Sequence, residues 1–239
     1  YSMPKRRRIN WVFSDVARWV LRTKHEWLAR LRGEAFYCGA LSGISEYNIT
    51  VNCDGTLTCN CHDYDGSGNL GDLNQQSFKE VFFGPKAQSF RDSLAKGKLP
   101  IRTCAHCGDL KRIKKSQLHE IKPRLPYRGM LLENTVRCNI DCIGCDRIQA
   151  AGLRKTKQME LDKVAKMADL VKELGLQQLF YLNLGEPFLS PNIGKEMLLL
   201  REKNPDCRIV ISSNAIILNT DARREAAMSA SHIYFSIHG

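Results

Sequence analysis

The sequence predicts an α/β fold: a partial barrel of strand–helix units, preceded by a small cysteine-rich α+β domain and an N-terminal amphipathic helix. Two observations lead to this expectation. From about residue 130 onward, apolar β-prone runs alternate with segments of helical periodicity, at about 25–45 residues per unit. Such alternation is typical of parallel strands joined by right-handed crossovers. Polar or glycine-containing residues also follow these runs, at the strand ends where parallel sheets bind their ligands.

The barrel region is expected at residues 130–239. Its predicted strands are at 130–137, 178–184, 208–213 and 232–237. Helices are expected between them, at about 158–174, 192–203 and 220–229. The sequence ends directly after the fourth strand, where an apolar edge would be exposed. We therefore expect the sequence to be a fragment of a longer protein.

Residues 9–32 have the periodicity of an amphipathic helix. Mostly apolar side chains recur there at spacings of three and four: Val12, Val16, Trp19, Val20, Thr23, Trp27 and Leu31. Residues 1–32 also hold nine Lys or Arg against two acidic residues, so most of the net charge of +11 lies in this segment. We expect the apolar stripe to dock on the body of the protein. Contact of residues 1–32 with a membrane surface is the alternative, and nucleic acid is less favoured because the remaining chain is only mildly basic.

A second module is expected at residues 33–118, followed by a linker at 119–129. The runs EYNITV and TLTCNC flank a turn sequence, Asn52-Cys53-Asp54-Gly55, which predicts a hairpin. Ser77 and Glu80 form a capping box that begins a short helix. A further helix is expected at about 87–96. We interpret the basic run KRIKK (111–115) as a solvated linker.

The sequence has ten cysteines, and its beginning shows no apolar segment followed by a cleavage site. Without an export signal, this many cysteines favours metal ligation in a reducing compartment over a disulfide framework. The expected location is the cytoplasm. No run of eighteen apolar residues is present, so the sequence predicts no membrane span.

Cys138, Cys142 and Cys145 form the pattern Cys-x3-Cys-x2-Cys directly after the first predicted strand. Three thiolates are one fewer than a closed zinc site or a fully ligated [4Fe–4S] cube needs. A cube held by three cysteines keeps one iron free for a small molecule. A zinc site with a fourth ligand from elsewhere is the alternative.

This pattern in this position resembles the radical S-adenosylmethionine (SAM) superfamily. The resemblance covers about residues 130–239, and it implies a [4Fe–4S] cluster on the three cysteines with SAM on the open iron. Leu184-Gly185-Glu186-Pro187 resembles the family's Gly-Gly-Glu-Pro segment, which implies SAM contacts from Gly185, Glu186 and Pro187. The polar ends of the third and fourth strands resemble further SAM-binding positions: Ser212, Asn214 and Ser236.

Two positions depart from the family pattern. Leu184 stands in place of the first glycine of the Gly-Gly-Glu-Pro segment. Gly144 precedes the third cysteine, where the family often has an aromatic residue that packs near adenine. No adenine contact is therefore assigned to this loop.

Residues 33–118 resemble the SPASM type of auxiliary-cluster domain, which normally follows the barrel and here precedes it. The resemblance rests on Cys38, the hairpin NCDGTLTCNC, Gly71-Asp72-Leu73, a Ser-Phe-Lys-Glu helix and Cys104-x2-Cys107. It implies an auxiliary [4Fe–4S] cluster that is held by Cys38, either Cys59 or Cys61, Cys104 and Cys107. Four thiolates would close that cluster and suit it to electron transfer. A structural zinc site with the same donors, or with His62 or His106, is the alternative.

The resemblance implies a radical SAM enzyme. One electron, from a donor of flavodoxin or ferredoxin type, cleaves SAM to methionine and a 5′-deoxyadenosyl radical that abstracts hydrogen from a C–H bond. The substrate is expected to be a peptide or a sugar, and epimerisation, dehydrogenation and cross-linking are all compatible outcomes. The alternative is a zinc-stabilised protein that binds nucleic acid or another partner without catalysis.

Overall fold

The computed structural model describes residues 5–61 and 63–237, with side chains from Val16 onward. Its central feature is a run of four parallel strands in the second half of the chain. They are β6 (Gly129–Leu132), β7 (Gln178–Tyr181), β8 (Arg208–Ser213) and β9 (His232–Phe235). The four predicted strands are therefore confirmed. β6 ends earlier than its apolar run because later residues bond to a loop instead, as the N–H of Val136 does to the carbonyl of Lys157 (3.1 Å).

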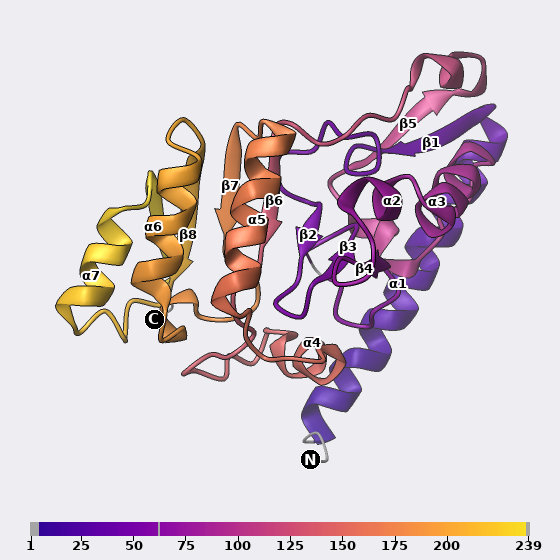
Figure 1. Cartoon of the computed structure of the whole chain (residues 1–239). Helices are drawn as coiled ribbons and strands as arrows, with labels where there is room; N and C mark the ends of the chain where they lie inside the picture. The colour runs from indigo at the N-terminus through magenta and orange to yellow at the C-terminus, as the bar shows by residue number, and fades with distance from the viewer. Residues whose placement is uncertain (1–4, 62, 238–239) are drawn as a thin grey trace.

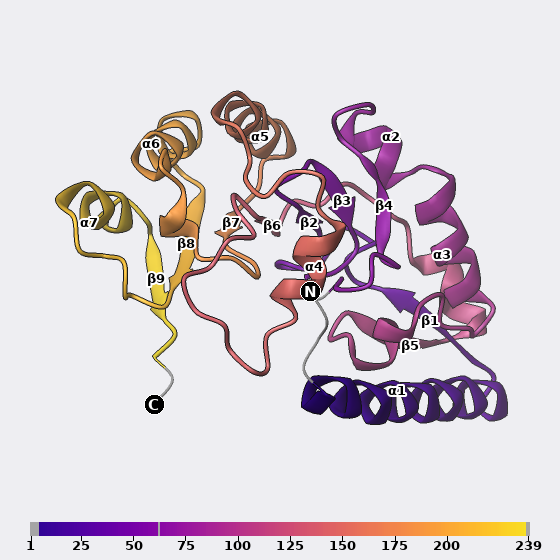
Figure 2. The same cartoon turned by 90° about the horizontal axis from the view of Figure 1, so that it is seen from below.

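Three helices connect these strands and lie on one face of the sheet (Figure 1, Figure 2). They are α5 (Leu161–Leu174), α6 (Ile193–Lys203) and α7 (Asp221–Met228), close to the predicted ranges. In α5, Val164, Ala168 and Val171 recur at helical spacing and are buried in the core. Gly175 ends α5 in the left-handed conformation (φ 58°), which glycine adopts without steric strain.

The predicted hairpin is also present, because β2 (Thr50–Val51) and β3 (Thr56–Thr58) are antiparallel. β4 (Asn69–Asp72) pairs with the other side of β3. In addition, β2 pairs in parallel with β6, with Val51 opposite Leu132. These strands therefore form one seven-stranded sheet of order β4-β3-β2-β6-β7-β8-β9. The sheet continues across the two regions that the sequence separates by a linker.

Two helices follow β4. α2 (Phe78–Phe82) begins at the predicted capping box, in which Ser77 and Glu80 bond reciprocally. α3 (Pro85–Ala95) begins directly afterwards, with Pro85 in its first turn where a missing N–H costs nothing. Phe82 and Phe90 from these helices are buried in the core.

A separate sheet of two antiparallel strands is formed by β1 (Glu34–Cys38) and β5 (Leu110–Lys114). The interpretation of KRIKK as a solvated linker is therefore wrong, since its first four residues belong to β5. Leu110 and Ile113 are half-buried, while the basic side chains beside them are exposed. The paired strand lies about 75 residues earlier in the chain. The local charge pattern gave no sign of this pairing.

The predicted N-terminal helix is α1 (Lys5–Leu31). The expectation that its apolar stripe docks on the body is wrong for the residues whose side chains are described. Ala29 is buried beside Phe36 and Leu99, whereas the stripe residues Trp19 and Trp27 are exposed. The inward side of α1 carries mainly small and polar residues, which make the contacts with the protein. Across the described residues, no helix combines the length and the apolar character needed to cross a membrane.

Candidate metal and cofactor sites

The residues after β6, β7, β8 and β9 surround one cavity of about 680 Å³. The thiols of Cys138, Cys142 and Cys145 line it. The predicted SAM-binding residues in its wall are Gly185, Glu186, Ser212, Asn214 and Ser236. The fold thus brings together all the residues predicted for this site except Pro187.

The three cysteines lie in the loop between β6 and a short helix, α4 (Arg147–Leu153), that the sequence did not predict. The N–H of Cys145 donates to the carbonyl of Cys142 (3.1 Å), which turns the loop back on itself. Cys142 is exposed, while Cys138 and Cys145 are partly buried. One short turn therefore presents three thiols to the same cavity and leaves one of them open to solvent.

Glu186 is buried at the end of β7, and only 3% of its surface is exposed. Its Oε1 accepts a hydrogen bond from the hydroxyl of Ser213 (2.8 Å), and its Oε2 accepts one from the N–H of Asn214 (2.8 Å). Oε1 also accepts a longer bond from the N–H of Phe188 (3.4 Å). Because a carboxylate oxygen has two lone pairs, Oε2 keeps capacity for a cationic group. The carboxylate is therefore fixed in direction but not fully satisfied.

Ser213 belongs to the polar end of the third predicted strand, and the sequence assigned it no role, although a signal for one exists. It continues the face of β8 that begins with Ile209 and Ile211, both fully or almost fully buried. A hydroxyl at a core position needs a hydrogen-bond partner. The nearest unpaired acceptor at that strand end is the carboxylate that follows β7.

The two departures from the family pattern have different surroundings. Leu184 lines the cavity. A β-carbon at Gly185 would lie 1.9 Å from the carbonyl oxygen of Thr135, so this close approach of two loops requires glycine. A β-carbon at Gly144 would have no heavy atom within 4 Å. Gly144 therefore leaves open space beside the cysteine loop.

Asn214 connects β8 to the cysteine loop. Its Nδ2 donates to the sulfur of Cys138 (3.8 Å) and to Oδ1 of Asn139 (2.9 Å). The hydroxyls of Ser212 and Ser236 lie 3.2 Å apart on neighbouring strand ends. The polar ends of β8 and β9 thus lie side by side in the wall of the cavity.

Pro187 is buried and does not line the cavity. Its carbonyl accepts a hydrogen bond from Nδ2 of Asn134 (3.1 Å). Asn134 also donates to the buried carboxylate of Glu196 (2.9 Å), which accepts from the hydroxyl of Tyr181 (2.8 Å) and from Ser190. This network holds the loop that begins at Glu186.

A second group of thiols lies in the first half of the chain. Burial raises the pKa of the Cys59 thiol well above its ordinary value, and the neighbouring thiols of Cys38, Cys104 and Cys107 add to that rise. Burial likewise raises the pKa of Cys104 to about 11. The four thiols are therefore neighbours in a part of the protein that is shielded from solvent.

Cys61 faces elsewhere. Its thiol donates to Oδ1 of Asn48 (3.5 Å) and lines a smaller cavity of about 430 Å³. Cys107 and His106 also line that cavity, whereas Cys59 does not. Cys59 is therefore better placed than Cys61 to act with the other three thiols. The two cavities meet at Asp146, which lines both.

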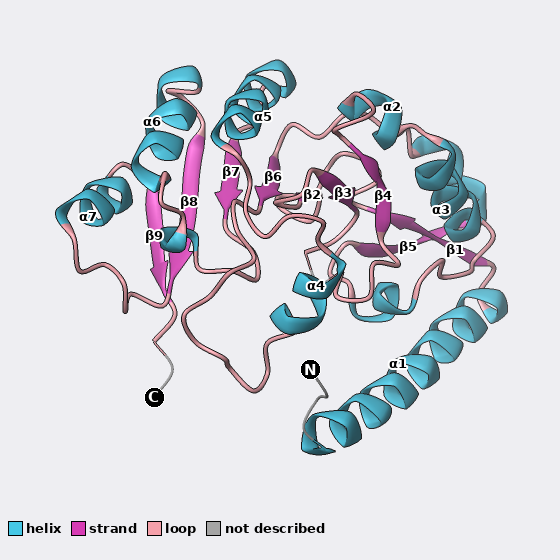
Figure 3. Cartoon of the chain, turned by 60° about the horizontal axis from the view of Figure 1, so that its bottom comes forward, coloured by secondary structure: helices cyan, strands magenta, loops and turns pink. Residues whose placement is uncertain are grey.

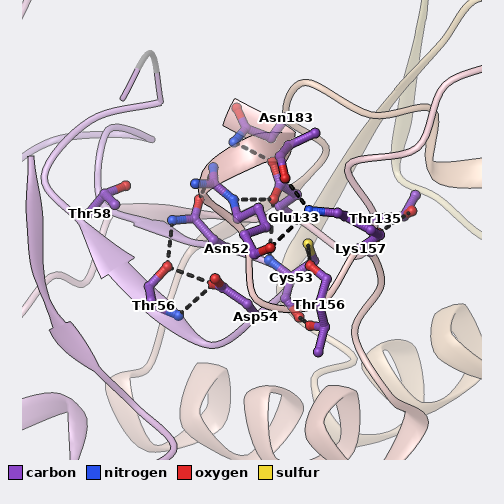
Figure 4. A network of polar contacts seen from close by, with 12 residues as sticks. Asn52, Cys53, Asp54, Thr56, Thr58, Glu133, Thr135, Thr156, Lys157 and Asn183 are labelled. Carbon is purple, nitrogen blue, oxygen red and sulfur yellow. Dashed lines mark hydrogen bonds and ion pairs between the residues drawn. The ribbon is translucent and has the colours of Figure 1, made fainter. Parts of the chain in front are cut away.

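Buried polar contacts connect the first half of the chain to the larger cavity (Figure 4). Glu133, fully buried after β6, pairs with Nε of Arg154 (3.0 Å). Its other oxygen accepts from Nδ2 of Asn183 (2.9 Å), a residue of the cavity wall. Arg154 also donates to Oδ1 of Asn52 (2.8 Å), and the N–H of Cys53 donates to Glu133 (3.3 Å). The hairpin turn is thus joined to the cavity wall.

Comparison with known families agrees with this geometry. Residues 132–239 match the model of the Radical SAM superfamily. These residues form a radical SAM domain. Residues 38–108 match the model of SPASM, an iron–sulfur cluster-binding domain. No curated protein and no solved structure matches the chain.

A radical SAM domain implies an enzyme with a [4Fe–4S] cluster and SAM, and a SPASM domain implies auxiliary iron–sulfur clusters. The residues present fit these groups. The larger cavity offers three thiols from one loop and a buried carboxylate with free acceptor capacity. The second group offers four neighbouring buried or partly buried thiols.

Within the described residues, which leave out His62, no three His, Cys, Asp or Glu side chains are placed to hold a single metal ion.

Proposed function

We propose that the cluster of this radical SAM enzyme is held by Cys138, Cys142 and Cys145. The observation that supports this most is the single cavity shared by three thiols of one loop and a buried carboxylate from the neighbouring strand end. When bound and reduced by one electron, the cluster and SAM supply a 5′-deoxyadenosyl radical that abstracts hydrogen from a C–H bond. The strands β6 to β9 would then form the first part of a (β/α) barrel.

In this proposal Glu186 orients SAM by accepting a hydrogen bond from its ammonium group. The hydroxyl of Ser213 and the N–H of Asn214 hold the carboxylate in place beforehand, which reduces the entropy lost on binding. Ser212 and Ser236 present hydroxyls to the same cavity and are proposed to bind the rest of SAM.

The proposed substrate is a peptide or a sugar. The cavity is lined by Asn183, Asp146 and Arg147. Their side chains offer hydrogen-bond donors and acceptors to the amide, carboxylate or hydroxyl groups of such a substrate. Epimerisation, dehydrogenation and cross-linking all begin with abstraction of a hydrogen atom from such a substrate. An electron donor of flavodoxin or ferredoxin type is proposed to approach the exposed side of the cysteine loop at Cys142.

The proposed auxiliary cluster is held by Cys38, Cys59, Cys104 and Cys107. Four thiolates leave no iron open, so this cluster is proposed to carry electrons rather than to bind substrate. Cys61 is left as a free thiol in the smaller cavity.

Anaerobic reconstitution with iron and sulfide tests the proposal. We expect about eight irons per chain, a brown spectrum, and 5′-deoxyadenosine after addition of dithionite and SAM. Cys145→Ala should lose about four irons and all of the nucleoside product. Cys207→Ala is the control, since Cys207 is buried far along the chain at the start of β8 and lines neither cavity. Nucleoside formation by Cys145→Ala would overturn the proposal.

A further inference from the structure

α1 has its polar side toward the protein. Oε1 of Glu26 accepts a hydrogen bond from the N–H of Leu99 (3.0 Å), and the ring of His25 packs edge-on against Phe36, with centroids 6.4 Å apart. Ala29 is completely buried at the centre of this contact. The partly buried side chain of Leu21 packs against the same cluster, so the helix is held to the protein by this leucine together with small and polar residues, and not by its tryptophans.

Those apolar side chains face outward. The exposed fraction is 55% for Val16, 62% for Trp19, 50% for Val20, 58% for Trp27 and 63% for Leu31. At 3.6 residues per turn, four of these five residues lie on the side of the helix opposite Ala29, and Trp19 lies at one flank of that side. A contiguous stripe of exposed tryptophan and aliphatic residues is uncommon on a protein surface and marks a site of interaction.

The position of α1 allows a flat surface to reach this stripe. The helix runs along one margin of the molecule, and every other helix and strand lies on one side of it (Figure 2, Figure 3). The outward side of α1 faces away from those elements. An extended plane could therefore contact the whole stripe without meeting the rest of the fold.

The charge around the stripe is positive. Lys24 and Arg30 are exposed at its margins, and the first turn of α1 has the sequence Lys5-Arg-Arg-Arg8. Long cationic side chains beside an aromatic stripe reach lipid phosphates while the rings enter the interface. Nucleic acid is a less suitable partner, because it would require cations across the contact face itself. A second copy of this chain is also less suitable, because it would bring like charges together.

We propose that α1 is a membrane-surface element that binds bilayers containing anionic lipids, with Val16, Trp19, Val20, Trp27 and Leu31 entering the headgroup region. This goes beyond the radical SAM chemistry and is independent of it. The larger cavity would then be held at a fixed distance from a membrane, where a lipid-linked or membrane-associated substrate or electron donor is concentrated.

The intrinsic fluorescence of the chain tests the proposal directly. All three tryptophans, Trp11, Trp19 and Trp27, belong to α1, so tryptophan emission reports on this helix alone. Vesicles of phosphatidylcholine with about one third phosphatidylserine should shift the emission to the blue and sediment with the protein. Vesicles of phosphatidylcholine alone should do so much less, and salt should weaken the effect because it screens the charges.

Matched variants distinguish binding through the stripe from nonspecific binding of the protein to vesicles. Val20→Glu should weaken binding to the anionic vesicles about tenfold or more, since it places a charge in the stripe. Leu198→Glu, at an equally exposed apolar position on α6 (56% exposed), should change binding less than about twofold. Replacement of Lys24 and Arg30 by Gln should weaken binding about fivefold for each lost cation.

Four results would overturn the proposal. The first is no sedimentation with the anionic vesicles, and the second is unchanged binding by Val20→Glu. The third is a concentration-dependent dimer with blue-shifted emission in the absence of lipid, because the stripe would then belong to an interface between two copies. The fourth is a single-stranded oligonucleotide that binds as tightly as the vesicles and independently of Val20.

Discussion

The carboxylate of Glu186 depends on two donors at the end of β8. The hydroxyl of Ser213 and the N–H of Asn214 each bond to one of its oxygens at 2.8 Å. Because the carboxylate is almost fully buried, loss of the Ser213 hydroxyl would leave Oε1 with only the longer bond from the N–H of Phe188 (3.4 Å). The direction in which this group points toward the cavity is therefore set by the neighbouring strand.

Ser213→Ala is expected to weaken SAM binding about five- to tenfold, which corresponds to about 1 kcal/mol for one buried hydrogen bond to a charged group. The dissociation constant can be measured by titration of the reconstituted protein without reductant. Ser231→Ala is the matched control, because its hydroxyl bonds to β8 at the opposite end, at the N–H of Ile209 (3.1 Å). Equal effects of the two substitutions would contradict a role for Ser213 in holding Glu186.

Asn214→Ala is expected to lower the reduction potential of the cluster at Cys138. Its Nδ2 donates to the sulfur of Cys138, and a hydrogen bond to a ligand sulfur stabilises the more negative, reduced cluster. Loss of about 1 kcal/mol of this stabilisation corresponds to a potential lower by about 40 mV for one electron. A redox titration followed by electron paramagnetic resonance measures the change. An unchanged potential with full iron content would show that this contact does not reach the cluster.

At the scale of elements, the hairpin places Cys59 and Cys61 differently relative to the other three thiols of the proposed auxiliary cluster. Cys59 directly follows β3, and its thiol interacts with those of Cys38, Cys104 and Cys107. Cys61 comes two residues later, after the strand has ended, and its thiol lies against Asn48. Spacing along the sequence leaves both cysteines open. Cys59 interacts with three thiols of the group, whereas Cys61 interacts with one of them, that of Cys107.

Cys59→Ala should therefore lose about four of the eight irons, whereas Cys61→Ala should keep all of them. Iron and sulfide counts after anaerobic reconstitution give this comparison within one experiment. Both variants should retain the three thiols of the loop at Cys138, so 5′-deoxyadenosine formation from SAM should persist in each. Loss of irons in Cys61→Ala but not in Cys59→Ala would show that Cys61 is the ligand instead.

The elements that the sequence predicts best are those whose signal is local. The alternation of apolar strands and helices after residue 130 gave β6 to β9 and α5 to α7, because each depends on its own periodicity. β5 and the β2–β6 pairing depend on partners far away in the chain, and β2 has only two residues. The outward stripe of α1 was missed because periodicity shows that an apolar face exists but not which way it points.

For the whole molecule, a continuous sheet and hydrogen bonds from a buried ion pair of the radical SAM domain connect the SPASM domain to the radical SAM domain. The pairing of β2 with β6 makes the sheet continuous, and Arg154 bridges Asn52 in the hairpin turn to Glu133 beside the cavity. The side chains of this ion pair are at most 5% exposed. We therefore expect the two domains to unfold together rather than as independent units.

Arg154→Gln tests this connection. It leaves the carboxylate of Glu133 buried without its cationic partner, which should lower the free energy of unfolding by about 3–5 kcal/mol. Urea denaturation followed by circular dichroism gives the free energy. The matched control is Arg128→Gln, which removes a solvent-exposed pair with Glu46 (2.9 Å) and should cost less than about 1 kcal/mol.

The double variant Arg154→Gln with Glu133→Gln should recover part of the lost stability, because it removes the unpaired charge as well. Such a recovery would show that the unpaired charge of Glu133 causes the loss of stability. Unfolding should remain a single transition in both variants, since both domains share the sheet. Two separate transitions in the single variant, with only one of them shifted, would show that the domains fold independently and that the bond from Arg154 to Asn52 does not couple them.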